Sequence, residues 1–191
     1  KIPPAPAAGT TLVLKPAEFT PFTATRYMEL AKQAGLPDGV LNLVLGDNEV
    51  SAALTRHTDV AKISFTGGPL TATRIMAAAS TNLTPVLFEL GGKGANLVFA
   101  DANLDEAIPF SARMPLLNAG QGCALPTRLL VERPIYDRVV EGVAACFAQF
   151  PQGDPLAADT FIGPLINAAA LDRVTGFIDA DAMLDKLRRV D

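Results

Sequence analysis

One cysteine of the chain lies in a glycine-rich turn. Cys123 follows Gly120, Gln121 and Gly122. Glycines let the backbone approach a ligand closely, and nearby N–H groups can stabilise a thiolate or the oxyanion that forms when the thiolate attacks a carbonyl. A free cysteine is also often a small buried hydrophobe. The turn alone leaves both interpretations open, a nucleophile and a packing residue.

A carboxylate is the second candidate for chemistry. Glu89 is the fourth residue of the apolar stretch "VLFEL", which Gly91 and Gly92 follow. A carboxylate that loses water in apolar surroundings becomes a stronger base, suited to activating a water molecule. The alternative is a glutamate that turns to solvent at the end of a strand, and this short context alone favours that alternative.

Two further turns have residue types that suit a nucleotide. Lys15 and Glu18 follow "LVL", and a lysine and a carboxylate at this spacing can hold the hydroxyls of a ribose. Gly67 and Gly68 lie in "FTGGP", where a pyrophosphate could meet the start of a helix. This turn lacks the Gly-x-Gly-x-x-Gly fingerprint, so each signal is weak by itself.

Several other chemistries have little support in the sequence. His57 is the only histidine and no Cys-x-x-Cys spacing occurs, so we expect no metal site. No Gly-x-Ser-x-Gly turn indicates a serine hydrolase. Cys146, the second cysteine, lies beside the apolar face of a predicted helix and is most simply explained by packing. Two cysteines make a poor disulfide framework, which favours a reduced, cytoplasmic setting.

Composition limits the possible partners. The chain has 191 residues, 49% of them hydrophobic, which is enough to form a core. The net charge is −4 and the basic residues are scattered, so we expect no nucleic-acid partner. No apolar run approaches the roughly 20 residues of a membrane span. The sequence does not begin with Met, and we interpret it as a fragment.

Strands and helices alternate through the first half of the sequence. The stretches "TTLVLKP", "VLNLVL", "VAKISF" and "PVLFEL" are predicted strands, and helical patterns separate the first three and follow the third. This order predicts a Rossmann-like parallel sheet with helices on both faces, over residues 1–90. Ligands bind beyond the carboxyl ends of such strands. Those ends hold Lys15, Gly46, residues 66–68 and Glu89.

The second half predicts a partial second α/β domain. "ANLVFA" and "RLLVER" are predicted strands, and helices are expected after Asn103 and over about residues 135–147. Pro109 and Pro115 fall in the helix that leads to Cys123 and could kink it. A last helical stretch runs to the end of the chain.

Six blocks of the chain together resemble the aldehyde dehydrogenase superfamily. In order they are "LVLKPAEFTP", "ISFTGG", "FELGGKGANLVF", "NAGQGCALPTR", "GDPL" and "GPLI", at distances familiar from that superfamily. The resemblance implies a partial NAD-binding domain over residues 1–90 and a partial catalytic domain over residues 91–178. Residues 179–191 would be a divergent C-terminal tail.

The resemblance also implies roles for individual residues. Cys123 would be the nucleophile and Glu89 the general base. The acid at Glu18 would repel the extra phosphate of NADP, so NAD is the expected cofactor and NADP the less expected one. The cofactor-binding residues implied are Lys15, Glu18, Gly46, Gly67, Gly68, Leu90 and Gly91.

The implied reaction is NAD(P)-dependent oxidation of a small-molecule aldehyde to a carboxylic acid, through a thiohemiacetal and a thioester on Cys123. The phosphate turn departs from the Gly-Ser-Thr-x-x-Gly of the family, because Gly68 and Pro69 replace its serine and threonine. The Pro-Trp-Asn and Glu-x-Phe-Gly-Pro blocks and the oligomerisation strands of these homo-oligomeric proteins lie outside the sequence. The alternatives are a non-catalytic remnant, at most a weak nucleotide-binding module, and an esterase-like remnant that needs only Cys123.

Overall fold

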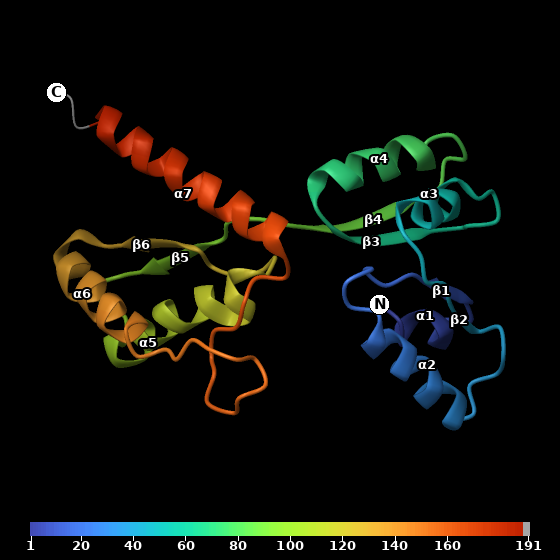
Figure 1. The fold of residues 1–191 in the computed structure, drawn as a ribbon, viewed down its shortest axis with the longest axis horizontal. Coiled ribbons are helices and arrows are strands. Elements are labelled where there is room, and N and C mark those ends of the chain that lie inside the picture. Colours follow the sequence, from blue (N-terminus) through green and yellow to red (C-terminus); the bar gives the residue numbers. More distant parts are fainter. Residues whose placement is uncertain (189–191) are drawn as a thin grey trace. The chain divides into compact units, whose positions relative to one another are not determined.

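The chain divides into two compact units. The computed structural model describes residues 1–188, and their contacts separate Lys1–Leu90 from the part that begins at Gly91 (Figure 1). Each unit combines short parallel strands with helices, which confirms the α/β class predicted from the alternation of apolar stretches.

The first unit alternates helices and strands along most of its length (Figure 1). Its strands pair in parallel as β1–β2 and β3–β4, rather than as one four-stranded sheet. Helix α4 packs against β3 and β4. The elements are α1 (Pro4–Ala7), β1 (Leu12–Leu14), α2 (Phe22–Gln33), β2 (Leu41–Leu43), α3 (Asn48–Arg56), β3 (Ile63–Gly67), α4 (Pro69–Ala79) and β4 (Val86–Leu90).

The pairing of β3 with β4 brings two of the predicted turns together. Thr66 is the register partner of Glu89, and Gly67 is the partner of Leu90. Because the strands are parallel, both end at the same edge. The start of helix α4 and the Glu89 segment therefore lie side by side, as the alternation of strands and helices predicts.

The second unit has one parallel pair of strands, β5–β6, in which Ala95 is opposite Arg128 and Val98 is opposite Val131. Helices α5 and α6 pack against each other. The elements are β5 (Ala95–Val98), α5 (Leu104–Arg113), the 3₁₀ segment η1 (Met114–Gly120), β6 (Arg128–Val131), η2 (Arg133–Ile135), α6 (Tyr136–Phe147) and α7 (Ala168–Arg188).

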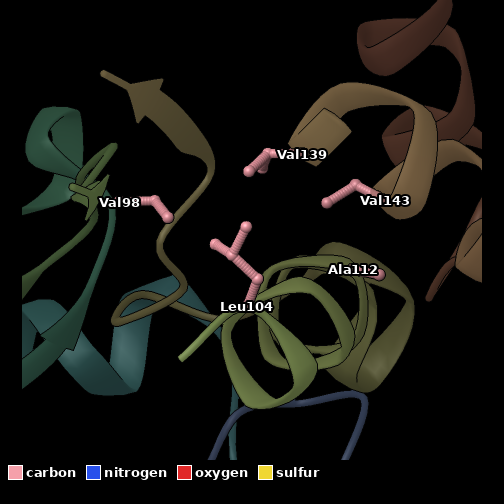
Figure 2. Close-up of a cluster of buried hydrophobic side chains, with 5 residues drawn as sticks. All are labelled: Val98, Leu104, Ala112, Val139 and Val143. Atoms are coloured by element: carbon pink, nitrogen blue, oxygen red, sulfur yellow. The ribbon is translucent and has the colours of Figure 1, made fainter. Parts of the chain in front are cut away.

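The core of the second unit forms where these helices meet strand β5. Figure 2 shows its five buried side chains, Val98, Leu104, Ala112, Val139 and Val143. They come from β5, α5 and α6, and partly buried residues such as Leu129 and Val131 of β6 pack around them. This apolar contact holds together the elements on either side of the Cys123 turn.

Helix α5 continues through Pro109, which the sequence suggested as a possible kink. The helix runs from Leu104 to Arg113 with Pro109 inside, and Pro115 falls in the following 3₁₀ segment. Near the proline, the Ser111 hydroxyl donates to the carbonyl of Ala107 over 2.6 Å and accepts from Asn96 Nδ2 over 2.8 Å. These bonds connect the proline-containing turn of α5 to strand β5.

Within residues 1–188, none of the helices combines the length and the apolar character that crossing a membrane requires.

The buried contact of β5, α5 and α6 predicts that two neighbouring valines contribute very differently to the free energy of unfolding. Val139 is fully buried, whereas Val140, the next residue of α6, is 40% exposed. Val139→Ala should lower the free energy of unfolding by about 2 kcal/mol, since it removes buried methyl groups and leaves a cavity. Val140→Ala is the matched control and should change it by less than about 0.5 kcal/mol. Urea unfolding followed by circular dichroism measures both, and equal losses would contradict this assignment of the core.

Candidate active site

An ion pair holds the turn after β1. Lys15 Nζ lies 2.8 Å from Glu18 Oε1 and also donates to the carbonyl of Pro16 over 2.9 Å. The Lys15 side chain is 12% exposed and that of Glu18 is 44% exposed. The hydrogen bond from Lys15, together with a backbone hydrogen bond within Glu18, lowers the pKa of the Glu18 carboxyl. Glu18 is therefore a fixed negative charge at this turn.

A hollow of about 180 Å³ lies beside this ion pair. Its walls are mostly apolar, and Glu18 is the one charged residue that lines it. This combination fits a flat ring that carries a hydroxyl-bearing sugar, because the ring contacts apolar walls and the hydroxyls donate to a carboxylate. The lining residues are Pro16, Ala17, Glu18, Pro21, Leu45 and Gly46.

Gly46 is required by the packing of helix α3 against the end of β2. A Cβ atom at Gly46 would lie 2.8 Å from Val50 Cβ and would also collide with Val50 Cγ2. Asp47 then caps α3 by accepting from the backbone N–H of Glu49 over 2.9 Å. The structure thus brings Gly46 and Glu18, both predicted from the sequence, to one hollow.

The turn between β3 and α4 keeps part of its capacity to bind an anion. Gly68 is the N-cap of α4 and Pro69 is its first residue, a position where proline is well tolerated. Pro69 has no N–H, but the N–H groups of Leu70 and Thr71 also precede the first intrahelical bond. Thr66 accepts a hydrogen bond from Lys1 Nζ over 2.8 Å, a contact that no pattern in the sequence indicated.

Glu89 lies at the carboxyl end of β4, beside Thr66. Its side chain is exposed, which agrees with the solvent-facing alternative that the short sequence context favoured. The physical reason is the period of two along a strand, which turns Phe88 inward and Glu89 outward. Leu90 ends β4 with 37% exposure. Gly91 opens the second unit, and a Cβ atom there would meet nothing within 4 Å.

Cys123 lies in the second unit, in the turn between η1 and β6. It is a free cysteine and is exposed, so it is not the buried packing residue that was one of the two interpretations. A Cβ atom at Gly122 would lie 2.7 Å from Leu125 Cγ, which explains the glycine immediately before it. Cys146 is half-buried and packs against the core of this unit, as expected.

Gln121 is a residue for which the sequence suggested no role. Its side chain bonds to Asn118 in its own turn and to the backbone of Ile166, 45 residues further along the chain. A glutamine between two glycines is the only signal in the sequence. Among the residues that the structure describes, no group of three or more His, Cys, Asp or Glu side chains is arranged to hold a metal ion.

Parallel α/β units, a mostly apolar hollow beside a carboxylate and an exposed cysteine in a glycine turn together define an α/β protein with a candidate nucleotide site and a candidate nucleophile. The sequence profile of the aldehyde dehydrogenase family matches residues 1–183. A curated aldehyde dehydrogenase from Alternaria alternata is 44% identical over 181 residues, which are 94% of this chain and 36% of that protein.

Solved structures show the same similarity. A cysteine-to-alanine variant of aldehyde dehydrogenase C from Pseudomonas syringae, in complex with NAD+ and octanal, is 37% identical with a TM-score of 0.90 over 96% of this chain and 38% of that one. An E. coli NADP dependent enzyme is 40% identical with a TM-score of 0.91 over 97% of this chain and 38% of that one.

The chain belongs to the aldehyde dehydrogenase family, as the six sequence blocks predicted. It spans about 36–38% of the length of the relatives named above.

The ion pair predicts how the Glu18 carboxyl titrates. Lys15→Met removes the hydrogen bond and should raise the pKa of Glu18 towards its ordinary value of 4.5. Because the folded-state pKa is lowered, ionised Glu18 stabilises the native turn above that ordinary value, and this contribution is lost as the pH falls through the lowered pKa. Lys15→Met should therefore make the turn less stable at neutral pH and its stability less dependent on acid pH.

The measurement is a titration of the Glu18 side-chain carboxyl carbon by nuclear magnetic resonance. Lys32→Met, on the exposed part of α2, is the control and should leave the Glu18 titration unchanged. An unchanged Glu18 midpoint in Lys15→Met would contradict the ion pair.

The close packing at Gly46 predicts that a methyl group added at this position destabilises the fold. Gly46→Ala should cost about 1–3 kcal/mol, the usual range for overpacking, because Val50 cannot move without shifting α3. Adding Val50→Ala should recover part of this loss. Gly92→Ala, in a loop where a Cβ atom meets nothing within 4 Å, is the matched control and should be nearly neutral. Thermal unfolding of these variants measures the loss of stability. A Gly46→Ala variant as stable as the unmodified chain would contradict the close approach of α3 to the end of β2.

Proposed function

We propose that this chain carries the nucleophile and much of the cofactor site for NAD-dependent oxidation of an aldehyde to a carboxylic acid. The observation that carries the proposal is Cys123, a free and exposed cysteine in a glycine turn that belongs to one of the six family blocks. A cysteine that served only packing would be expected against the core, as Cys146 is.

The first unit has residues that suit the cofactor. The hollow beside Glu18 and Gly46 would take the adenosine, with Lys15 holding the Glu18 carboxylate in place. The start of α4 at Gly67 and Gly68 would face the pyrophosphate, and Leu90 and Gly91 complete the proposed set through their place in the family block. When bound, the nicotinamide of NAD accepts the hydride that leaves the substrate.

We propose NAD rather than NADP because of the charge at Glu18. Its carboxyl is ionised at neutral pH, because even its ordinary pKa of 4.5 lies far below pH 7 and the hydrogen bond from Lys15 lowers the pKa further. An ionised carboxylate beside a ribose repels an added phosphate. One relative was solved with NAD+ and another is described as NADP dependent, so the choice for this chain depends on Glu18.

Cys123 and Glu89 divide the chemistry between them. The Cys123 thiolate attacks the aldehyde carbon, an S–C bond forms, and the carbonyl electrons move to an oxygen that the Cys123 backbone N–H can stabilise. After the hydride has left, the product on Cys123 is a thioester. Glu89 accepts a proton from water, whose oxygen attacks the thioester, and the C–S bond breaks to release the carboxylic acid and the thiolate.

The proposed setting is the cytoplasm. Cys123 and Cys146 are both free thiols, and a nucleophilic thiol keeps its function in a reducing compartment. The proposed partner is a small-molecule aldehyde.

A second candidate function is a nucleotide-binding module without dehydrogenase activity. It is favoured by the exposure of Glu89, which leaves the carboxylate solvated, and by Pro69, which removes one N–H from the phosphate turn. Such a module would be stabilised by NAD without turning over an aldehyde.

The experiment is NADH formation from octanal and NAD+ by the chain and three variants. Cys123→Ala should abolish the reaction, since loss of a nucleophile lowers kcat by orders of magnitude. Glu89→Gln should lower kcat roughly 10²–10⁴-fold, the usual contribution of a general base. Cys146→Ala is the matched cysteine control and should retain activity.

NADH formation that survives Cys123→Ala would contradict the proposed nucleophile. If NAD raises the Tm of the unmodified chain but neither this chain nor any variant forms NADH, the result supports the nucleotide-binding module instead.

A further inference from the structure

We propose that Gln121 is a positioning residue, which fixes the Cys123 turn by joining it to Asn118 and to the backbone of Ile166. This inference rests on the proposed role of Cys123 as nucleophile. It concerns the backbone before the cysteine, because the exposed sulfur itself is not held by packing.

The turn before Cys123 has an unfavourable backbone conformation. Asn118 and Ala119 have φ values of 52° and 53°, and Gly120 follows with a φ of 75°. Glycine adopts this left-handed region freely and asparagine tolerates it, but an alanine is sterically penalised there. Three such residues in succession therefore need other interactions to keep the chain in this turn.

Two amide side chains provide those interactions within the turn. The Asn118 carbonyl accepts from the backbone N–H of Gln121 over 3.0 Å and from Gln121 Nε2 over 3.0 Å. Asn118 Nδ2 donates in return to the Gln121 carbonyl over 3.3 Å. The turn is thus closed by a reciprocal set of bonds between the two residues.

The other end of the Gln121 amide reaches a distant segment of the second unit. Its Oε1 accepts from the backbone N–H of Ile166 over 3.0 Å. The amide is therefore used as a donor towards Asn118 and as an acceptor towards Ile166. A glutamate could replace only the acceptor, and an alanine could replace neither.

Cys123 is held between this amide and a buried leucine. Gly122 separates Gln121 from Cys123 and lies so close to the Leu125 side chain that a Cβ atom would collide with it. Leu125 is itself buried. The backbone is anchored on both sides of the cysteine, and small displacements of a reacting group lower rates steeply.

The test measures acylation of Cys123 in the full chain, in a Cys146→Ala background that leaves one thiol. With p-nitrophenyl acetate, the thiolate forms an S–C bond to the acetyl carbon, the ester C–O bond breaks, and p-nitrophenolate leaves with the electron pair. Gln121→Ala should lower the maximal rate of p-nitrophenolate release roughly two- to tenfold, the effect of one ordinary hydrogen bond. The half-saturating ester concentration should stay unchanged.

Hydrogen exchange gives a second readout at Ile166. Its amide should exchange faster in Gln121→Ala, and Gln121→Glu should restore the protection because it keeps the acceptor. Asn118→Gly keeps the left-handed backbone and removes only the local donor, so it should slow acylation while leaving Ile166 exchange unchanged. Gln149→Ala, an exposed glutamine after α6, is the matched control and should change neither readout.

The inference is overturned if Gln121→Ala leaves either the acylation rate or the Ile166 exchange unchanged. If Gln121→Ala does not fold, Gln121→Glu and Asn118→Gly decide the question by the same two readouts. A chain that depends on Gln121 for acylation but forms no NADH refutes the proposed function and supports the positioning role. If the chain forms NADH at the same rate with and without Gln121, the result supports the proposed function and refutes the positioning role.

Discussion

Parallel pairing of neighbouring strands is the constraint on which the proposed cofactor site of this protein depends. Two parallel strands end at one edge, so the residues that follow them are neighbours whatever their distance in sequence. In the first unit this places Glu89 opposite Thr66, at the start of the turn that we propose faces the pyrophosphate. The β1–β2 pair likewise ends beside the hollow that Glu18 lines. The polar residues can gather there because apolar strands and helices provide the packing behind them.

The turn that contains Cys123 depends on a different kind of constraint. Cys123 follows the end of η1, where the backbone leaves helical geometry and turns left-handed at Asn118 and Ala119. Hydrogen bonds of side-chain amides and the close approach of Gly122 to Leu125 hold this part of the chain. The elements around it are held by the buried contact of β5, α5 and α6. A rigid core thus carries a turn whose own conformation is maintained by a few hydrogen bonds.

Much of this arrangement could be predicted from the sequence, and the parts that could not have physical reasons. Short apolar stretches followed by glycine or proline located the strands, and the spacing of Lys15 and Glu18 singled out two residues that the structure joins in an ion pair. The exposure of Glu89 is the alternative that the short sequence context favoured, and in the structure the residue lies on the outward face of β4. The hydrogen bond between Gln121 and Ile166 was not predictable, since it joins residues 45 positions apart.

The central claim is that Cys123 forms a covalent bond to the aldehyde carbon and carries the oxidised product. The most direct measurement uses the Glu89→Gln variant, which should hydrolyse the thioester slowly. The variant is mixed with octanal and NAD+, and the mass of the peptide that contains Cys123 is then measured. We predict an octanoyl group on Cys123 that appears only when both the aldehyde and NAD+ are present and is absent from the Cys146 peptide. An unmodified Cys123, or equal modification of the two cysteines, would contradict the claim.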